Sequence, residues 1–168
     1  MVYNSSGYES AESLHRLDGL IDIYMPDFKY FSSELSQKYS SAADYLPVAT
    51  EAITEMFRQT GKYEYSQSEP DILKSGLVVR HQVLPGQRKD SMAVLDHLAR
   101  ILPTDKMLIS LMSQYTPEFA IDCQFKELHR RVTSFEYSSV VQHAELLGFE
   151  GFIQSKESAT SVFTPDFK

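Results

Sequence analysis

The sequence has a single cysteine, Cys123, among its 168 residues. One thiol cannot form an internal disulfide, and it cannot hold an iron–sulfur cluster, which needs several thiolate ligands. The five histidines do not replace the missing thiolates, because no pair of them has the spacing of a metal site. The sequence therefore predicts no metal site made by this chain alone, and Cys123 is interpreted as a passive thiol.

Long apolar runs and a basic surface are also absent. No run approaches the ~18 apolar residues of a membrane-spanning helix, and residues 1–6 lack the basic and apolar regions of a signal peptide. Lys and Arg number 16 against 23 Asp and Glu, which gives a net charge of −7 at pH 7. We therefore expect a cytoplasmic protein that binds neither membranes nor nucleic acid, and we interpret the short basic stretch at 129–131 as a solvated loop.

Common catalytic motifs are missing as well. The chain has no G-x-S-x-G nucleophile elbow and no glycine-rich phosphate loop. Its composition is that of a globular protein, with 42% apolar and 23% charged residues, and its length is enough to bury one sizeable core. We therefore predict a single domain over residues 1–168, whose function must be sought at the ends of its strands.

Strand and helix patterns alternate along the chain. Short apolar or alternating runs predict strands near 2–3, 19–29, 76–84, 107–112 and 151–154, with a small hairpin at 62–74. Helical spacing predicts helices near 11–17, 34–39, 47–60, 91–101 and 134–147. The predicted caps are Ser10, Ser33, either Asp90 or Ser91, and a capping box formed by Thr133 and Glu136. This order is typical of βα units, so we predict an α/β fold with mostly parallel strands.

The strand over 19–29 carries the most informative polar residues. Asp27 and Lys29 are two residues apart, so their side chains project from the same face at the carboxyl end of that strand. Arg80 lies on the next long strand, and the carboxyl ends of parallel strands meet on the side where α/β folds bind ligands. A ligand carboxylate would bind Lys29 or Arg80, and a ligand amine or a cation would bind Asp27. Two alternatives are an exposed ion pair without function and an acid–base pair in a cofactor-independent enzyme.

Four stretches of the sequence together resemble a known family. They are Tyr-Asn-Ser-Ser-Gly-Tyr at 3–8, Asp-Ile-Tyr-Met-Pro-Asp-Phe-Lys-Tyr at 22–30, Val-Arg-His-Gln-Val-Leu-Pro-Gly at 79–86 and Leu-Met-Ser-Gln-Tyr at 111–115. In this order and spacing they resemble the later part of radical SAM proteins, especially relatives of pyruvate formate-lyase activating enzyme. The resemblance extends over residues 1–155.

This resemblance implies a fold, two cofactors and a partner. The fold would be the C-terminal half of a partial (βα)6 TIM-like barrel. Members of the family bind a [4Fe–4S] cluster and S-adenosylmethionine (SAM) and carry out radical chemistry with them. In the activating enzymes the radical removes hydrogen from a glycine of another protein, so the implied partner is a glycyl-radical enzyme or another protein substrate.

The resemblance also places SAM-binding residues on the first two strands. Asn4 and Ser5 stand where the family often has Asp and Thr, and they would face the methionine part of SAM. Met25, Asp27 and Lys29 match the pattern at the end of the next strand. Lys29 and Asp27 would lie near the SAM carboxylate and a bound monovalent cation.

The resemblance implies two further SAM-binding residues, which belong to the later strands. Arg80 matches an arginine of the family, and Tyr115 stands where many members have a histidine near the adenosine. Asn4 and Tyr115 both depart from the activating enzyme itself, which leaves the substrate open. None of the residues matched in this way is assigned a catalytic role.

One part of the family pattern is absent from the sequence. The three-cysteine loop that holds the cluster and the Gly-Gly-Glu motif that orients the SAM amine both belong to the N-terminal part of the barrel. The resemblance therefore implies a C-terminal fragment that is inactive and retains no cofactor on its own. We expect such an open barrel to self-associate through its edge at residues 2–3. The alternative is a non-catalytic α/β binding or interaction module that reuses the fold.

Overall fold

The structure is a computed structural model that describes residues 1–117 and 124–153. Cys123, the last residue of the predicted strand at 151–154 and the polar tail that follows it lie outside the described residues. The described helices are α1 (Ala11–His15), α2 (Ser33–Ser40), α3 (Tyr45–Thr60), α4 (Arg88–Ile101), α5 (Ser134–Leu146) and a short 3-10 helix (Lys126–His129). The described strands are β1 (Val2–Ser5), β2 (Ile23–Pro26), β3 (Glu64–Tyr65), β4 (Leu73–Gln82), β5 (Leu108–Met112) and β6 (Glu150–Ile153).

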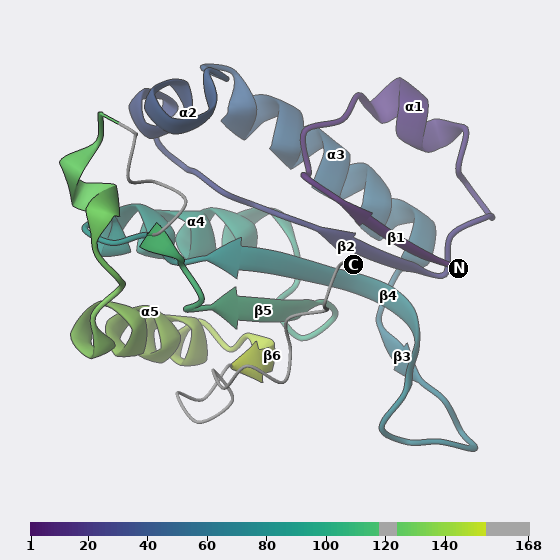
Figure 1. Cartoon of the computed structure of the whole chain (residues 1–168). Coiled ribbons are helices and arrows are strands. Elements are labelled where there is room, and N and C mark those ends of the chain that lie inside the picture. The colour runs from purple at the N-terminus through teal and green to yellow at the C-terminus, as the bar shows by residue number, and fades with distance from the viewer. Residues whose placement is uncertain (118–123, 154–168) are drawn as a thin grey trace, which may run out of the picture.

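The strands form one sheet that is almost entirely parallel. Its order is β1-β2-β4-β5-β6, with every neighbouring pair parallel, whereas β3 pairs antiparallel with β4. In Figure 1 the arrows of β4 and β5 lie side by side and point the same way, and the hairpin between β3 and β4 extends away from the sheet. The predicted α/β fold with mostly parallel strands is confirmed.

The predicted hairpin exists, but its second arm is the beginning of β4. The sequence predicts a strand that starts at Gly76, after a separate hairpin arm that ends at 74, whereas β4 runs continuously from Leu73 to Gln82. Gly76 has a φ of 133°, and a Cβ built there would lie 2.6 Å from the Cα of Tyr63. The glycine therefore allows the chain before β3 to approach β4 without ending the strand.

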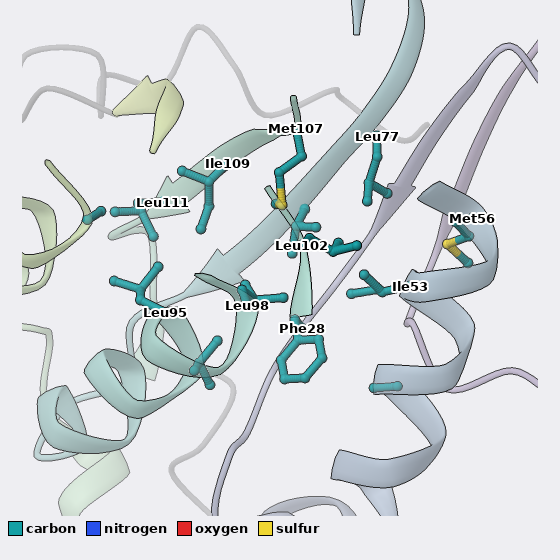
Figure 2. Close-up of a cluster of buried hydrophobic side chains, with 14 of the residues drawn as sticks. Phe28, Ile53, Met56, Leu77, Leu95, Leu98, Leu102, Met107, Ile109 and Leu111 are labelled. Carbon is teal, nitrogen blue, oxygen red and sulfur yellow. The ribbon is translucent and has the colours of Figure 1, made fainter. Parts of the chain in front are cut away.

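One face of the sheet carries the hydrophobic core. Alternate residues of β2, β4 and β5 point to this face, where they pack with buried residues of α3, α4 and α5. Figure 2 shows Leu77 and Leu111 of the sheet together with Ile53 of α3 and Leu98 of α4. Burying a side chain of this size contributes about 1.5–3 kcal/mol. Helices α3, α4 and α5 thus cover this face of the sheet, and the polar side chains at the strand ends lie on the opposite face.

The helix ends agree in part with the capping predictions. Ser10 caps α1, and Thr133 and Glu136 form the predicted capping box of α5. Helix α2 is capped by Ser32, one residue before the predicted cap. Among the described residues, no helix is long and apolar enough to cross a membrane.

Helix α4 begins earlier than its sequence predicts. Its first residue is Arg88, whereas a cap at 90 or 91 was expected. The carboxylate of Asp90 is engaged elsewhere, because it accepts the backbone N–H groups of Phe31 and Ser32 at 3.1 and 2.8 Å. Asp90 therefore joins α4 to the loop that follows β2.

Residues 129–131 are exposed, as expected of a solvated loop, although the side chain of Arg130 also pairs with Glu136. Its guanidinium donates to both carboxylate oxygens of Glu136, at 2.7 and 2.8 Å, and Glu136 also accepts the backbone N–H of Gly86 at 2.8 Å. The hydrogen bonds from Arg130 are the main reason that the pKa of Glu136 lies well below its usual range. This network fixes the segment before α5 to the turn after β4.

Candidate functional site

A pocket lies at the carboxyl ends of β2, β4 and β5. Its volume is ≈ 380 Å³. Its polar lining residues are Asp27, Lys29, Arg80 and Gln82, and its apolar and aromatic ones are Tyr30, Tyr39, Leu84, Met112, Tyr115 and Leu128. Both the size and the location are typical of ligand sites in α/β folds, so we take this pocket as the candidate site.

Three ionised side chains, Asp27, Lys29 and Arg80, form a charged cluster at one end of the pocket. Arg80 donates from Nε and Nη2 to Oδ1 of Asp27, at 2.9 and 2.6 Å. The Nζ of Lys29 lies 3.8 Å from the other carboxylate oxygen, Oδ2. Two cations thus share one carboxylate, which leaves a net positive charge inside an acidic protein. This end of the pocket will attract a singly charged anion, such as a carboxylate.

The sheet itself brings Asp27 to Arg80. Asp27 forms a parallel bridge with Arg80 just beyond the end of β2, and the N–H of Phe28 donates to the carbonyl of Arg80 at 2.8 Å. Phe28 and His81 are both buried in the core. Because side chains alternate along a strand, their neighbours at 27, 29 and 80 must project on the opposite face. The geometry of the charged cluster therefore follows from strand pairing.

Aromatic rings form another part of the pocket wall. The hydroxyl of Tyr30 is hydrogen-bonded to Ser40 at 3.0 Å, and that of Tyr39 donates to Glu127 at 2.7 Å. Burial raises the pKa of both tyrosines, so both phenols stay neutral at neutral pH. Since their hydroxyls are engaged with protein groups, these tyrosines offer mainly ring surface to a ligand.

The same wall is completed by the short 3-10 helix. Glu127 in this helix accepts hydrogen bonds from both Lys38 and Tyr39 of α2. The bond from Lys38 is the main reason that the pKa of Glu127 falls to about 2. These contacts place the next residue, Leu128, against the pocket. The wall therefore depends on contacts between segments that are far apart in the sequence.

Four of the seven predicted SAM-binding residues meet in this pocket. Asp27, Lys29, Arg80 and Tyr115 all line it, although they come from the ends of three different strands. The prediction that polar groups at neighbouring strand ends lie together is confirmed for these four. Tyr115 lies beyond the end of β5, where its backbone N–H donates to the carbonyl of Ser113 at 2.8 Å.

The other three predicted residues lie to the side of the pocket. Asn4 on β1 is exposed and is the register partner of Met25 on β2, so the two share the face that carries the charged cluster. The side chain of Ser5 is used in the turn after β1, where its Oγ accepts the N–H of Gly7 at 3.3 Å. None of these three is among the pocket-lining residues.

Sequence reasoning missed several residues that build the site. A histidine within a strand gives no more than a packing signal, and His81 is buried, but its Nδ1–H also donates to the carbonyl of Phe28 at 2.7 Å. Tyr45 binds the backbone beside Asp27 and carries no local signal of that role. Tyr39 and Leu128 come from a helix and a long loop in which no polar motif marks a site.

Asp27→Asn is expected to lower the free energy of unfolding by about 1–2 kcal/mol, because Arg80 then loses its charged partner. Urea unfolding at neutral pH would measure this loss. The matched control is Glu12→Gln, which breaks an exposed pair with Arg16 on α1 and should cost less than about 0.5 kcal/mol. Equal losses in the two variants would show that the Asp27–Arg80 pair has no special role in the fold.

Comparisons with known proteins give one relative. No model of a protein family matches the chain, and no solved structure matches it. The chain is similar to an uncharacterized protein of Methanocaldococcus jannaschii, with 24% identity over 146 residues. The match covers 86% of this chain but only 38% of the relative. The chain therefore spans less than half the length of the protein it resembles.

Proposed function

We propose that this chain forms the later βα units of a radical SAM barrel and contributes the part of the SAM pocket that lies at the carboxyl ends of its strands. The observation that carries the proposal is the meeting of Asp27, Lys29, Arg80 and Tyr115 in one pocket. The family resemblance assigns all four to SAM, and they come from strand ends that are separated along the chain. If the resemblance did not reflect a shared function, these four side chains would not need to line the same cavity.

The chemistry of the pocket fits the two ends of SAM. Its amino-acid carboxylate would bind Lys29 and the free edge of the Arg80 guanidinium. With that negative charge in place the cluster is no longer net positive, and Asp27 would bind the ammonium group of SAM or a monovalent cation. The adenine ring is planar and largely apolar on its faces. It would lie against the ring surface of Tyr39 and Tyr115, where stacking favours flat groups.

The residues of this chain do not fit an iron–sulfur cluster. The sequence has one cysteine, and within 1–117 and 124–153 no three side chains of His, Cys, Asp or Glu are grouped as a metal site. Cluster ligands would have to come from other residues of a longer polypeptide or from another chain. We therefore derive no radical step for this chain and assign it a part in SAM and substrate binding.

The edge of the sheet at β1 is where such a barrel would continue. The carbonyls of Met1 and Ser5 bond to β2, so Val2 and Asn4 between them direct their backbone groups to the free edge. Exposed edges of this kind pair with further strands. We propose that this edge receives a preceding barrel strand and that, without one, it supports self-association of the chain. A glycyl-radical enzyme or another protein substrate would then approach the open end of the barrel.

Titration of the chain with SAM, followed by amide NMR, tests the proposal. Part of the pocket lies outside this chain, so we expect weak binding that requires millimolar SAM. The shifted amides should cluster at the ends of β2, β4 and β5. In Lys29→Gln the half-saturating SAM concentration should rise about tenfold, because one charged contact to the carboxylate is lost.

The control variant is Lys62→Gln, which removes the same charge from an exposed lysine outside the pocket. It should leave the titration unchanged. Shifts elsewhere in the chain, or none at all, contradict the proposal. If L-methionine alone produced the same shifts at the same concentration as SAM, the result would contradict a nucleoside site and favour the alternative of an amino-acid-binding module.

A further inference from the structure

The segment 27–29 is held through its backbone as well as through its side chains. The N–H of Asp27 donates to the carbonyl of Ser5 at 3.0 Å, and the N–H of Phe28 donates to the carbonyl of Arg80 at 2.8 Å. These bonds come from the strands on either side. Two polar groups of the segment, the carbonyl of Asp27 and the N–H of Lys29, face a single side chain instead.

That side chain is Tyr45, the first residue of α3. Its hydroxyl oxygen lies 2.9 Å from the nitrogen of Lys29, 3.2 Å from the carbonyl oxygen of Asp27 and 3.3 Å from that of Ser6. A phenol has one proton, so it accepts the N–H of Lys29 and donates to one of the two carbonyls at a time. Tyr45 is only 3% exposed, so water does not compete for these bonds.

The ring of Tyr45 is fixed by its neighbours. Tyr8 stacks on it, with ring centroids 5.8 Å apart and planes at 10°. The rings of Phe28 and Tyr30 meet it edge to face, at 6.0 and 5.5 Å. A ring packed on several sides cannot swing away, so its hydroxyl holds one position relative to the end of β2.

We infer that Tyr45 is a positioning residue, which orients Asp27 and Lys29 for the ligand by fixing the backbone between them. Tyr45 is not a pocket-lining residue, so it acts only through the segment 27–29. The identity of the ligand rests on the proposed function. The geometry of Tyr45 and the segment 27–29 does not depend on it.

The position of this segment explains why it needs such support. Strand β2 ends at Pro26, so Lys29 lies three residues beyond the last regular pairing with β1. Lys29 also has a long side chain, whose ordering on ligand binding costs conformational entropy. Because the backbone of Lys29 is already fixed in the free protein, less conformational entropy is lost when the ligand binds.

Tyr45→Phe removes the hydroxyl and keeps the ring, and Tyr24→Phe is the matched control. Tyr24 is also a buried tyrosine, but its hydroxyl bonds to Gln59, away from the pocket. We expect hydrogen exchange of the Lys29 amide to accelerate about tenfold in Tyr45→Phe but not in Tyr24→Phe. The half-saturating SAM concentration should rise at least about fivefold in Tyr45→Phe alone, since only that variant loosens the segment.

Each outcome decides the inference. Exchange of the Lys29 amide that is equal in the two variants overturns it, because the hydroxyl then does not hold the segment. Faster exchange with unchanged SAM binding also overturns it, because the bond is then only structural. If the wild-type chain binds no SAM, the proposed function fails. Hydrogen exchange of the Arg80 Nε–H then tests the role of Tyr45 instead. Faster exchange of this N–H in Tyr45→Phe alone would support the role of Tyr45 in placing Asp27, and no change would refute it.

Discussion

Gly7→Ala is expected to lower the free energy of unfolding by about 3 kcal/mol and to displace Asp27. Gly7 has a φ of +72°, a conformation that costs an L-residue about 1 kcal/mol or more. A Cβ at this position would also lie 2.0 Å from the carbonyl oxygen of Asp27. That oxygen belongs to the backbone, so relieving the contact must move the chain and adds about 2 kcal/mol. Urea unfolding measures the loss of stability, and amide NMR shifts at 27–29 measure the displacement.

Gly19→Ala provides a control with nearly the same backbone conformation. Its φ is +78°, but no atom lies within 4 Å of a Cβ built there. This variant should lose only about 1 kcal/mol, the cost of the left-handed conformation itself, and it should leave the amides at 27–29 unshifted. Similar losses in both variants would contradict a close approach of the turn at Gly7 to the end of β2.

Protonation of His81 is expected to destabilise the fold below pH 6.5. The ring is 1% exposed. Its Nδ1 must carry the proton that is donated to the carbonyl of Phe28, and Nε2 has no hydrogen-bond partner among the described residues. Burial therefore lowers the pKa of His81, and this effect outweighs the opposing attraction of the Asp90 and Asp27 carboxylates.

The pH dependence follows from that direction. The unfolded chain titrates with the ordinary histidine pKa of about 6.5, so it takes up the proton before the folded chain does. Above pH 6.5 the free energy of unfolding has its full value. It falls below that pH by up to about 1.4 kcal/mol per pH unit, until the lower pKa of the folded state is reached.

Unfolding measurements at several pH values with His81→Asn test this prediction. The asparagine amide can still donate to the carbonyl of Phe28 but does not titrate, so the slope between pH 4.5 and 6.5 should decrease. Burial and nearby Arg100 also lower the pKa of His97, so His97→Gln is needed to account for its share. Glu55 and Glu127, with pKa values of about 2, lose their stabilising contacts only below about pH 4.5. A slope that His81→Asn leaves unchanged would refute the assignment.

The charged end of the pocket could be predicted from the sequence because its rule is local. Asp27 and Lys29 share a face through the two-residue period of a strand, and parallel pairing places Arg80 beside them. The aromatic end follows no such rule. Tyr39 and Leu128 meet because Glu127 bonds to Lys38, 89 residues earlier in the chain, and a single long-range ion pair has no signature in either segment.

Two errors in the predicted elements have the same origin. Residue type favours either Asp90 or Ser91 as a helix cap, but the carboxylate of Asp90 instead accepts hydrogen bonds from the backbone of the loop after β2. Gly76 was taken as the beginning of a strand, but it lies within β4, where Tyr63 approaches closely. In both cases a tertiary contact outweighed the local preference.

The pocket wall is built from segments that are far apart in the sequence, from Asp27 to Leu128. A ligand bound there would therefore hold together segments that are far apart in the polypeptide. Its binding free energy would add to the resistance of the whole unit to heat and to proteases, by an amount that grows with its concentration relative to its dissociation constant. Departure of that molecule would weaken the protein as a whole, and not only the cavity it leaves.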